Sequence, residues 1–290
     1  MNNKTAFLTT IFPADENYIS EYFSTLAKQT YKNFDIILVN DGFQYLDKIT
    51  RKFPNLVIYE LESAGSIAKN RQLMISHAWN ANYQFAIFGD CDDYFSDNRV
   101  EVTIAKLKLN DVVFNQVIPF GQGIDKAEDY FGGRLSEGEV ISADDILNKN
   151  VLGFSNTGIN LNCLEDFTID FPNDLVAVDW YFFSLLLGRG KTACYTKHCQ
   201  TFYRQYTENT IGFKTIDSER LRYILKVKLI HFTTLLRNDL RYNKCLENIK
   251  LLEEFLLVNE SSYLKQVNQI TNPLWWELID LTEFKNENYK

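Results

Sequence analysis

The chain has 290 residues, of which 46% are hydrophobic and 14% aromatic. This is enough apolar material for one large globular domain with an appendage, and it excludes disorder as the main state. The 30 basic and 38 acidic residues give a formal net charge of -8, so a general affinity for nucleic acid is not expected.

The cysteines and the amino-terminal residues indicate the cellular compartment in which the protein is expected. The five cysteines are scattered and form no Cys-x-x-Cys pair, which favours reduced thiols over a disulfide framework or a zinc site. The first 12 residues lack the features of a secretory signal. The most apolar run elsewhere, residues 180–187, is far shorter than the roughly 20 residues that cross a bilayer. We therefore expect a cytoplasmic protein without a transmembrane helix.

Strand-like and helical patterns alternate from residue 5 to about residue 120. We expect strands at residues 6–12, 34–40, 55–60, 84–90 and 111–119. We expect helices at residues 16–29, 66–79 and 99–109. This alternation predicts an α/β fold with a mostly parallel, Rossmann-like sheet and helices on both faces. Ligands of such sheets bind at the carboxyl ends of the strands.

The second half of the chain changes character. Residues 121–175 are rich in Gly, Asp and Asn with weak periodicity, which is typical of loops over an active site. A helix at 176–187 and a strand at 192–204 are expected next. The last 75 residues show apolar positions at spacings of three and four, which predicts a helical carboxyl-terminal extension, residues 216–290, after a first domain of residues 1–215.

A cluster of carboxylates follows the fourth expected strand. Asp90, Asp92 and Asp93 lie within four residues, and like charges at that spacing repel one another. A Mg²⁺ or Mn²⁺ ion, shared with substrate phosphate oxygens, is the simplest remedy. The alternative is a solvated acidic turn, but the position at a strand's carboxyl end favours a functional cluster.

Two further polar segments follow expected strands. Asp41 precedes Gly42 at a sharp turn, where its carboxylate can accept a hydrogen bond from a nucleobase, although an ordinary Asp-Gly turn explains the pair equally well. Ser66 is a helix cap, and Lys69 and Arg71 in the first turns can reach a diphosphate. A capped surface helix with two solvated cations is the alternative.

Taken in order, residues 26–42, 65–70 and 88–93 resemble the GT-A fold glycosyltransferases of family 2. The resemblance covers residues 5 to about 120 well and extends loosely to about residue 210. It implies a GT-A catalytic domain in residues 1–215. Nucleotide-sugar binding is then expected mainly in residues 1–120, and the acceptor side mainly in residues 121–215.

The resemblance also implies roles for the acidic residues. Asp41 would hold the nucleotide base, Asp90 and Asp92 would bind the sugar diphosphate, and Asp92 and Asp93 would bind the metal. A later acidic residue that opens a helix is the general base in the family, and Asp179 matches it.

Other candidates rest on weaker matches. Asp174 competes with Asp179 for the role of base. Thr9, at the end of the first strand, and Lys69, where an arginine is common, are candidates for the nucleotide sugar, although the family more often has other sequences there. Arg204 lies in a segment that resembles a family segment near the sugar diphosphate, and a surface ion pair is its alternative. His198 is a candidate metal ligand, although a histidine packed on a strand is an equal alternative.

These roles predict an inverting, metal-dependent glycosyltransferase, a hexosyltransferase-like enzyme of bacterial-type surface polysaccharide or glycoconjugate assembly. Its donor would be a nucleotide-diphosphate sugar and its acceptor a saccharide or a lipid-linked saccharide. A haloacid-dehalogenase-type phosphatase also uses Asp-x-Asp after a strand and is one alternative. A non-catalytic nucleotide-sugar binding module is the other.

The carboxyl-terminal extension carries a local positive charge. Between residues 214 and 250 there are nine basic and four acidic residues. A basic helix with an apolar face can lie on an anionic membrane, which would give peripheral contact at the inner face of the membrane. We favour the alternative that the apolar face packs against the catalytic domain or a second subunit, which leaves a homodimer open.

Overall fold

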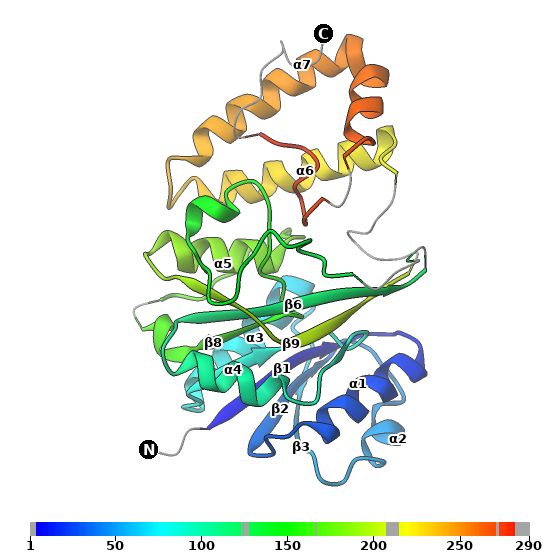
Figure 1. Ribbon diagram of the computed structural model, residues 1–290, viewed down its shortest axis with the longest axis vertical. Helices are drawn as coiled ribbons and strands as arrows, with labels where there is room; N and C mark the ends of the chain where they lie inside the picture. Colours follow the sequence, from blue (N-terminus) through cyan, green and yellow to red (C-terminus); the bar gives the residue numbers. More distant parts are fainter. Residues whose placement is uncertain are drawn as a thin grey trace.

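The computed structural model describes residues 4–122, 124, 128–165, 167–206, 215–270 and 273–281. A nine-stranded sheet forms the centre, in the order β3-β2-β1-β4-β8-β6-β9-β5, with β7 paired to β9 (Figure 1). The strands are β1 (Thr5–Ile11), β2 (Phe34–Asn40), β3 (Val57–Glu62), β4 (Phe85–Phe88), β5 (Tyr94–Phe95), β6 (Val112–Gly121), β7 (Val140–Ile141), β8 (Thr157–Asn160) and β9 (Ala193–Gln205). The helices are α1 (Glu16–Lys28), α2 (Leu46–Thr50), α3 (Ile67–Asn80), α4 (Arg99–Leu107), α5 (Val178–Gly188), α6 (Ser218–Leu235) and α7 (Tyr242–Val267), with 3-10 turns η1 (Ala143–Ile146) and η2 (Leu161–Leu164).

The first half of the sheet is parallel, as expected. β1 pairs in parallel with β2 and β4, and β2 pairs in parallel with β3. All seven residues of β1 are buried, because a central parallel strand is covered by helices on both faces. The polar residues that follow β2 and β4 therefore meet at one edge of the sheet.

The second half of the sheet adds short antiparallel strands to the predicted parallel ones. β8 lies antiparallel between β4 and β6, and among the described strands four pairs are parallel and four antiparallel. β8 falls in the segment that we expected to be loops. A Cβ atom on Gly158 would lie 2.7 Å from the Thr103 methyl group. Gly158 therefore lets α4 pack closely on β8, but a glycine within so short a strand also weakens the sequence pattern from which a strand is predicted.

Helices cover both faces of the sheet. One apolar cluster joins α1, α2 and α4 to β1 and β2, and a second joins α3, α5, α6 and α7 to the opposite face. The Asp15 side chain accepts a hydrogen bond from the Asn17 N–H at the start of α1, and Ser66 caps α3 by accepting from the Lys69 N–H. Both are usual amino-terminal caps.

The last described helices continue the second apolar cluster. Figure 1 shows α6 and α7 beyond α5, away from α1 and α2. The apolar residues of α6 pack within the chain, which agrees with the packing alternative. Lys214 of the basic segment lies outside the described residues. None of the described helices has both the length and the apolarity needed to cross a bilayer. The boundary near residue 215 stays a prediction.

One lysine of α6 is buried in this interface. Lys228 is fully buried, and its ammonium donates to the backbone oxygen of Asn148 at 2.9 Å, to Asn148 Oδ1 at 2.8 Å and to the Ile279 oxygen at 2.5 Å. These acceptors use all three donors of the ammonium group. Burial lowers the pKa of Lys228 to about 7, against the opposing effect of Asp280.

We expect this lysine to make stability depend on pH. Between about pH 7 and the ordinary lysine pKa, the unfolded chain binds one proton more than the folded chain at this site, so the free energy of unfolding rises with pH. The rise approaches about 1.4 kcal/mol per pH unit at most. Relative to Lys228→Met, the wild type should therefore gain stability between pH 7.5 and 9.5, measured by urea unfolding.

The exposed Lys226 on the same helix provides the control. A Lys226→Met variant should keep the pH dependence of the wild type. An unchanged stability difference between wild type and Lys228→Met over this range would contradict the lowered pKa.

Candidate active site

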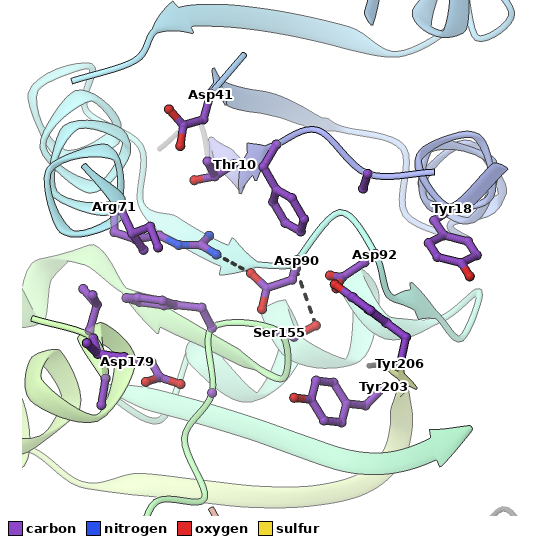
Figure 2. Close-up of a pocket in the computed structure, with 18 of the residues that line it drawn as sticks. Thr10, Tyr18, Asp41, Arg71, Asp90, Asp92, Ser155, Asp179, Tyr203 and Tyr206 are labelled. Atoms are coloured by element: carbon purple, nitrogen blue, oxygen red, sulfur yellow. Dashed lines mark hydrogen bonds and ion pairs between the residues drawn. The ribbon is translucent and has the colours of Figure 1, made fainter. Parts of the chain in front are cut away.

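A cavity of about 850 Å³ lies at the carboxyl ends of β1, β2 and β4. Figure 2 shows Arg71, Asp90 and Asp92 between Asp41 and Asp179. The residues that line the cavity are Thr10, Phe12, Pro13, Ala14, Asp15, Tyr18, Asp41, Ile67, Arg71, Asp90, Asp92, Gln122, Gly153, Phe154, Ser155, Val176, Ala177, Val178, Asp179, Tyr203, Tyr206, Trp275 and Trp276. Five residues predicted from the sequence thus meet in one cavity, namely Asp41, Arg71, Asp90, Asp92 and Asp179.

Asp41 is held at the end of β2 by a short hydrogen-bonded chain. Ser63 Oγ donates to Asp41 Oδ1 at 2.6 Å and approaches Asn70 Oδ1 at 3.1 Å. The buried Asn70 also accepts from the Ala64 N–H at 2.7 Å. The loop after β3 is therefore fixed to α3, and it orients the Asp41 carboxylate toward the cavity.

Asp90 forms an ion pair with Arg71, and the Asp90 N–H donates to Ser155 Oγ at 3.5 Å. The Arg71 guanidinium also lies over the Phe154 ring, 5.1 Å from its centroid. Arg71 thus neutralises the first carboxylate of the cluster and is oriented by an aromatic face.

Asp92 points into the cavity from a buried position. Its Oδ2 accepts a hydrogen bond from the Tyr206 hydroxyl at 2.6 Å. Burial, followed by the neighbouring Asp90 charge, raises the pKa of Asp92, while Tyr206 acts in the opposite direction. A buried carboxylate with no ion-pair partner among the described residues is a position where a cation relieves the cost of burial.

Asp93 has a different environment, which corrects its prediction as a metal ligand. It is 1% exposed and does not line the cavity. One carboxylate oxygen accepts from the Arg204 N–H at 2.8 Å, and the other is bonded to the Ser155 hydroxyl. Burial raises the pKa of Asp93 well above its ordinary value. Both oxygens are used in holding the loop before β8 and the end of β9 together.

A buried arginine lies beneath the acidic loop. Arg99 is 0% exposed, donates to the Phe88 oxygen at 2.6 Å and to Asn115 Oδ1 at 3.0 Å, and lies 4.3 Å from the centroid of the Phe95 ring. A Cβ atom on Gly89 would lie 2.6 Å from the Phe7 ring. The backbone that leads into Asp90 is therefore fixed by a cation on one side and by an aromatic ring on the other.

Two predicted ligands of the nucleotide sugar lie outside the cavity. Thr9 is 0% exposed, whereas Thr10 lines the cavity, because successive side chains of a strand point to opposite faces. The Lys69 ammonium is bonded to Asp170 at 2.9 Å and to Gln72 at 2.9 Å. Neither Thr9 nor Lys69 lines the cavity in this structure.

Arg204 and His198 are also placed differently from the prediction. Arg204 Nε donates to the Asp92 backbone oxygen at 2.8 Å, and its guanidinium pairs with Glu21, so it orients the acidic loop from outside the cavity. His198 Nε2 lies 3.5 Å from a carboxylate oxygen of Glu137, and its side chain is 61% exposed. His198 does not line the cavity.

Among the described residues, no group of three or more His, Cys, Asp or Glu side chains is arranged to hold a metal. A metal in this cavity would therefore have few protein ligands, and the carboxylates of Asp92 and Asp90, which line the cavity, are the ones that could hold it. Such a site suits Mg²⁺, which usually takes one or two protein carboxylates together with substrate phosphate oxygens and water.

Asp179 lies at the start of α5. Its Oδ1 accepts from the Trp180 N–H at 2.7 Å, and its other oxygen is left for the cavity that it lines. Burial raises the pKa of Asp179 to about 6, and the Trp180 hydrogen bond acts in the opposite direction. The competing Asp174 is exposed and does not line the cavity.

Several lining residues were missed from the sequence: Ser155, Tyr203, Tyr206, Trp275 and Trp276. The tyrosines flank Arg204 in a segment that the sequence had marked, but only the arginine was assigned a role. The tryptophans lie near the end of the chain, where nothing local connects them to the sheet. Their place follows from long-range packing.

Comparisons with known proteins agree with this geometry. The family model described as Glycosyl transferase family 2 matches residues 8–158. A glycosyltransferase named GlyA, from Streptococcus pneumoniae serotype 4, is 33% identical over 98 residues, which cover 32% of this chain and 13% of that relative. The chain thus matches only a small part of the length of this curated relative.

Solved structures share the fold. S. aureus TarS 1–349 in complex with UDP-GlcNAc has a TM-score of 0.64 at 17% identity, over 93% of this chain and 79% of that chain. The mannosyltransferase PcManGT from Pyrobaculum calidifontis, in complex with GDP-Man and Mn²⁺, has a TM-score of 0.52 at 12% identity, over 80% of this chain and 64% of that chain. Both confirm a GT-A type architecture for this chain.

The different environments of Asp92 and Asp93 lead to a test of the structural role of Asp93. Asp93→Ala leaves the Arg204 N–H and the Ser155 hydroxyl without this partner, so we expect the free energy of unfolding to fall by about 1–3 kcal/mol. Asp93→Asn keeps an acceptor for Arg204 and a polar partner for Ser155, so most of that stability should remain. Urea unfolding at pH 7 measures both. Equal losses in the two variants would contradict the hydrogen-bonding role.

Proposed function

The chain belongs to glycosyl transferase family 2, and from this we propose that it transfers a sugar from a nucleotide-diphosphate donor to an acceptor hydroxyl with inversion at the anomeric carbon. The observation that carries the proposal is the meeting of Asp41, Arg71, Asp90, Asp92 and Asp179 in one cavity. Nucleotide-sugar binding at strand carboxyl ends is common to α/β folds.

We propose that the donor lies along the wall formed by the ends of β1, β2 and β4. Asp41, oriented by Ser63, accepts a hydrogen bond from the nucleotide base. Arg71 offers a cation to the sugar diphosphate, although its pairing with Asp90 limits that contribution. UDP-GlcNAc and GDP-Man, bound by the two structural relatives, are the donor classes to test first.

The residues present fit a divalent metal. Asp92 is buried, lines the cavity and has a raised pKa, which are the conditions in which a bound cation offsets the cost of a buried charge. Asp92 would hold Mg²⁺ or Mn²⁺ with Asp90 beside it. Such an ion, when bound, stabilises the negative charge of the departing diphosphate.

We propose Asp179 as the general base. Its free carboxylate oxygen removes the proton of the acceptor hydroxyl while the acceptor oxygen bonds to the anomeric carbon and the bond from that carbon to the diphosphate oxygen breaks. One displacement of this kind inverts the anomeric centre. Retention would need a second carboxylate as nucleophile. Apart from Asp179 and the metal and nucleotide residues, the described carboxylate that lines the cavity is Asp15, which caps the start of α1.

Because the chain belongs to glycosyl transferase family 2, we do not retain the alternative of a haloacid-dehalogenase-type phosphatase. A non-catalytic binding module would bind the nucleotide sugar but would not turn it over, whereas the proposed enzyme does both. We further propose a saccharide or lipid-linked saccharide as acceptor and a role in surface polysaccharide or glycoconjugate assembly. Incubation with UDP- and GDP-sugars and Mn²⁺, with and without saccharide acceptors, tests the proposal.

Replacement of Asp92 tests the metal role. We expect Asp92→Asn to weaken metal-dependent binding of UDP or GDP by about tenfold or more, because the neutral amide is a poor ligand for a divalent cation. Stability without metal should not fall, because the wild-type carboxylate is buried with a raised pKa. Isothermal titration with and without Mn²⁺ measures the binding. Full wild-type turnover in excess EDTA would refute metal dependence.

Replacement of Asp179 tests the base. Asp179→Asn should lower turnover by about 10²-fold or more and leave donor affinity nearly unchanged. Because the carboxylate acts in its ionised form, wild-type turnover should rise with pH through about 6, the pKa of Asp179. This acidic limb should disappear in the variant.

Asp174→Asn, at an exposed carboxylate outside the cavity, is the matched control and should retain turnover. Loss of donor binding in Asp179→Asn would assign Asp179 to binding instead of proton transfer. Unchanged cellular function in that variant would favour a binding module.

A further inference from the structure

The segment after α7 returns to the cavity. We call residues 273–281 the return segment, and Figure 1 draws it in red beside α6. The Asn150 N–H donates to the Trp275 oxygen at 2.8 Å, and the two residues form an isolated antiparallel bridge. Asn150 begins the loop that brings Phe154 and Ser155 to the cavity. The return segment is therefore attached to an established wall of the site.

Polar contacts from several elements hold the return segment in place. Lys228 of α6 donates to the Ile279 oxygen, and Asn248 of α7 donates to the Leu281 oxygen at 2.8 Å. Further contacts include an Arg134–Glu277 ion pair at 2.6 Å and a hydrogen bond from the Tyr130 hydroxyl to the Pro273 oxygen at 3.2 Å. Contacts at both ends and in the middle fix the position of the two tryptophans between them.

Trp275 and Trp276 are built into the cavity wall. They are 8% and 7% exposed, and both line the cavity. The ring of Trp275 packs on Tyr130 with centroids 4.9 Å apart, and the ring of Trp276 lies nearly parallel to that of Trp180, 6.1 Å away. Trp180 is the residue after Asp179. The wall is thus packed on the helix turn that carries the proposed base.

The backbone at this wall is unusual in two places. Trp276 has a φ of +67°, a conformation that bulky residues rarely adopt and that persists only where surrounding contacts impose it. A Cβ atom on Gly153 would lie 3.1 Å from the Trp275 ring, so the indole packs closely on the backbone there. Strained backbone beside a catalytic group is a reason to look for a functional role.

We propose that Trp275 and Trp276 form the acceptor subsite, an apolar wall against which a pyranose ring of the acceptor packs its C–H face. The inference rests on the proposed function and adds the acceptor class and the residues that select it. Apolar lining of the cavity comes from Gly153, Phe154, Val176 and the two indoles, and Trp276 packs on Trp180, the residue after Asp179. The groups suited to a diphosphate come from α3 and from the loop after β4. Apolar walls with a few placed polar groups orient small ligands.

This arrangement orients the acceptor for transfer. A pyranose has an apolar face of C–H groups and a rim of hydroxyl groups. When the face packs on the indoles, the rim is left for the polar groups that line the same cavity, and Asp179 is one of them. Aromatic rings give large contact area at low cost in side-chain entropy. Asp179 then takes the proton from the hydroxyl held nearest to it.

Kinetics of tryptophan variants test the subsite. With p-nitrophenyl pyranosides of glucose, galactose and N-acetylglucosamine as acceptors, Trp276→Ala and Trp275→Ala should raise the acceptor KM by about tenfold or more. Trp276→Phe should restore part of the loss, since it keeps an aromatic face. In all three variants the KM for the donor should change less than the KM for the acceptor.

Ile279→Val, in the same segment but outside the cavity, is the matched control for altered packing. It should lower the melting temperature slightly and leave the acceptor KM unchanged. If Ile279→Val raises the acceptor KM as much as Trp276→Ala does, the effect is general loosening of the segment and the proposal is overturned.

A binding measurement separates the subsite from the reaction. Saturation-transfer NMR with methyl pyranosides and UDP should show contact to ring C–H protons in wild type and its loss in Trp276→Ala. Wild-type protein that hydrolyses donors but shows no pyranoside contact, or contact that survives in both alanine variants, overturns the subsite. Failure of all donors to turn over, with pyranoside contact retained, would instead count against the proposed function.

Discussion

Three carboxylates at the end of one buried strand repel one another, and the surrounding structure is organised around this repulsion. Each carboxylate has a different partner. Asp90 pairs with Arg71, Asp92 accepts from Tyr206, and Asp93 is bonded to Ser155 and to the backbone at residue 204. Repulsion between like charges is large where water is scarce, so these partners offset the cost of bringing the three acids together.

The partners come from distant parts of the chain, and the fold therefore closes around the acids. Arg71 is supplied by α3, Ser155 by the loop before β8, and Tyr206 by the residue after β9. The buried Arg99 adds a positive charge below the loop. Since Asp93 uses both of its oxygens within the protein, Asp92 is the one of the two that lines the cavity, which is why we propose it as the metal ligand. The adjacent acids thus differ in role because Asp90 and Asp92 reach the cavity and Asp93 does not.

The local sequence predicted well where strands end, but it predicted less well which side chains face the cavity and which residues they contact. Hydrophobic runs followed by polar residues located β1, β2 and β4, and so located Asp41, Asp90 and Asp92. The same pattern does not say which of Thr9 and Thr10 faces the cavity, because a register shift of one residue exchanges the two faces. β8 was missed because four residues with a glycine inside them give no clear period. The Lys69 ammonium donates to Asp170, and His198 lies beside Glu137; both partners are far away in sequence.

The carboxyl-terminal helices show why the acceptor side was the hardest part to predict. Trp180 lies between His231 of α6, at 3.8 Å, and Trp276 of the return segment, at 6.1 Å. The residue beside the proposed base is thus packed on side chains that follow it by about 50 and about 100 positions. No local period encodes such a contact, because it depends on where α6 and α7 dock. A single apolar cluster includes α3, α5, α6 and α7, so the orientation of α5 and that of the helices beyond it are set together. Docking of the helical extension therefore shapes the wall of the cavity beside Asp179, and the Lys228 amine, bonded to Asn148 and to the return segment, lies within that same interface.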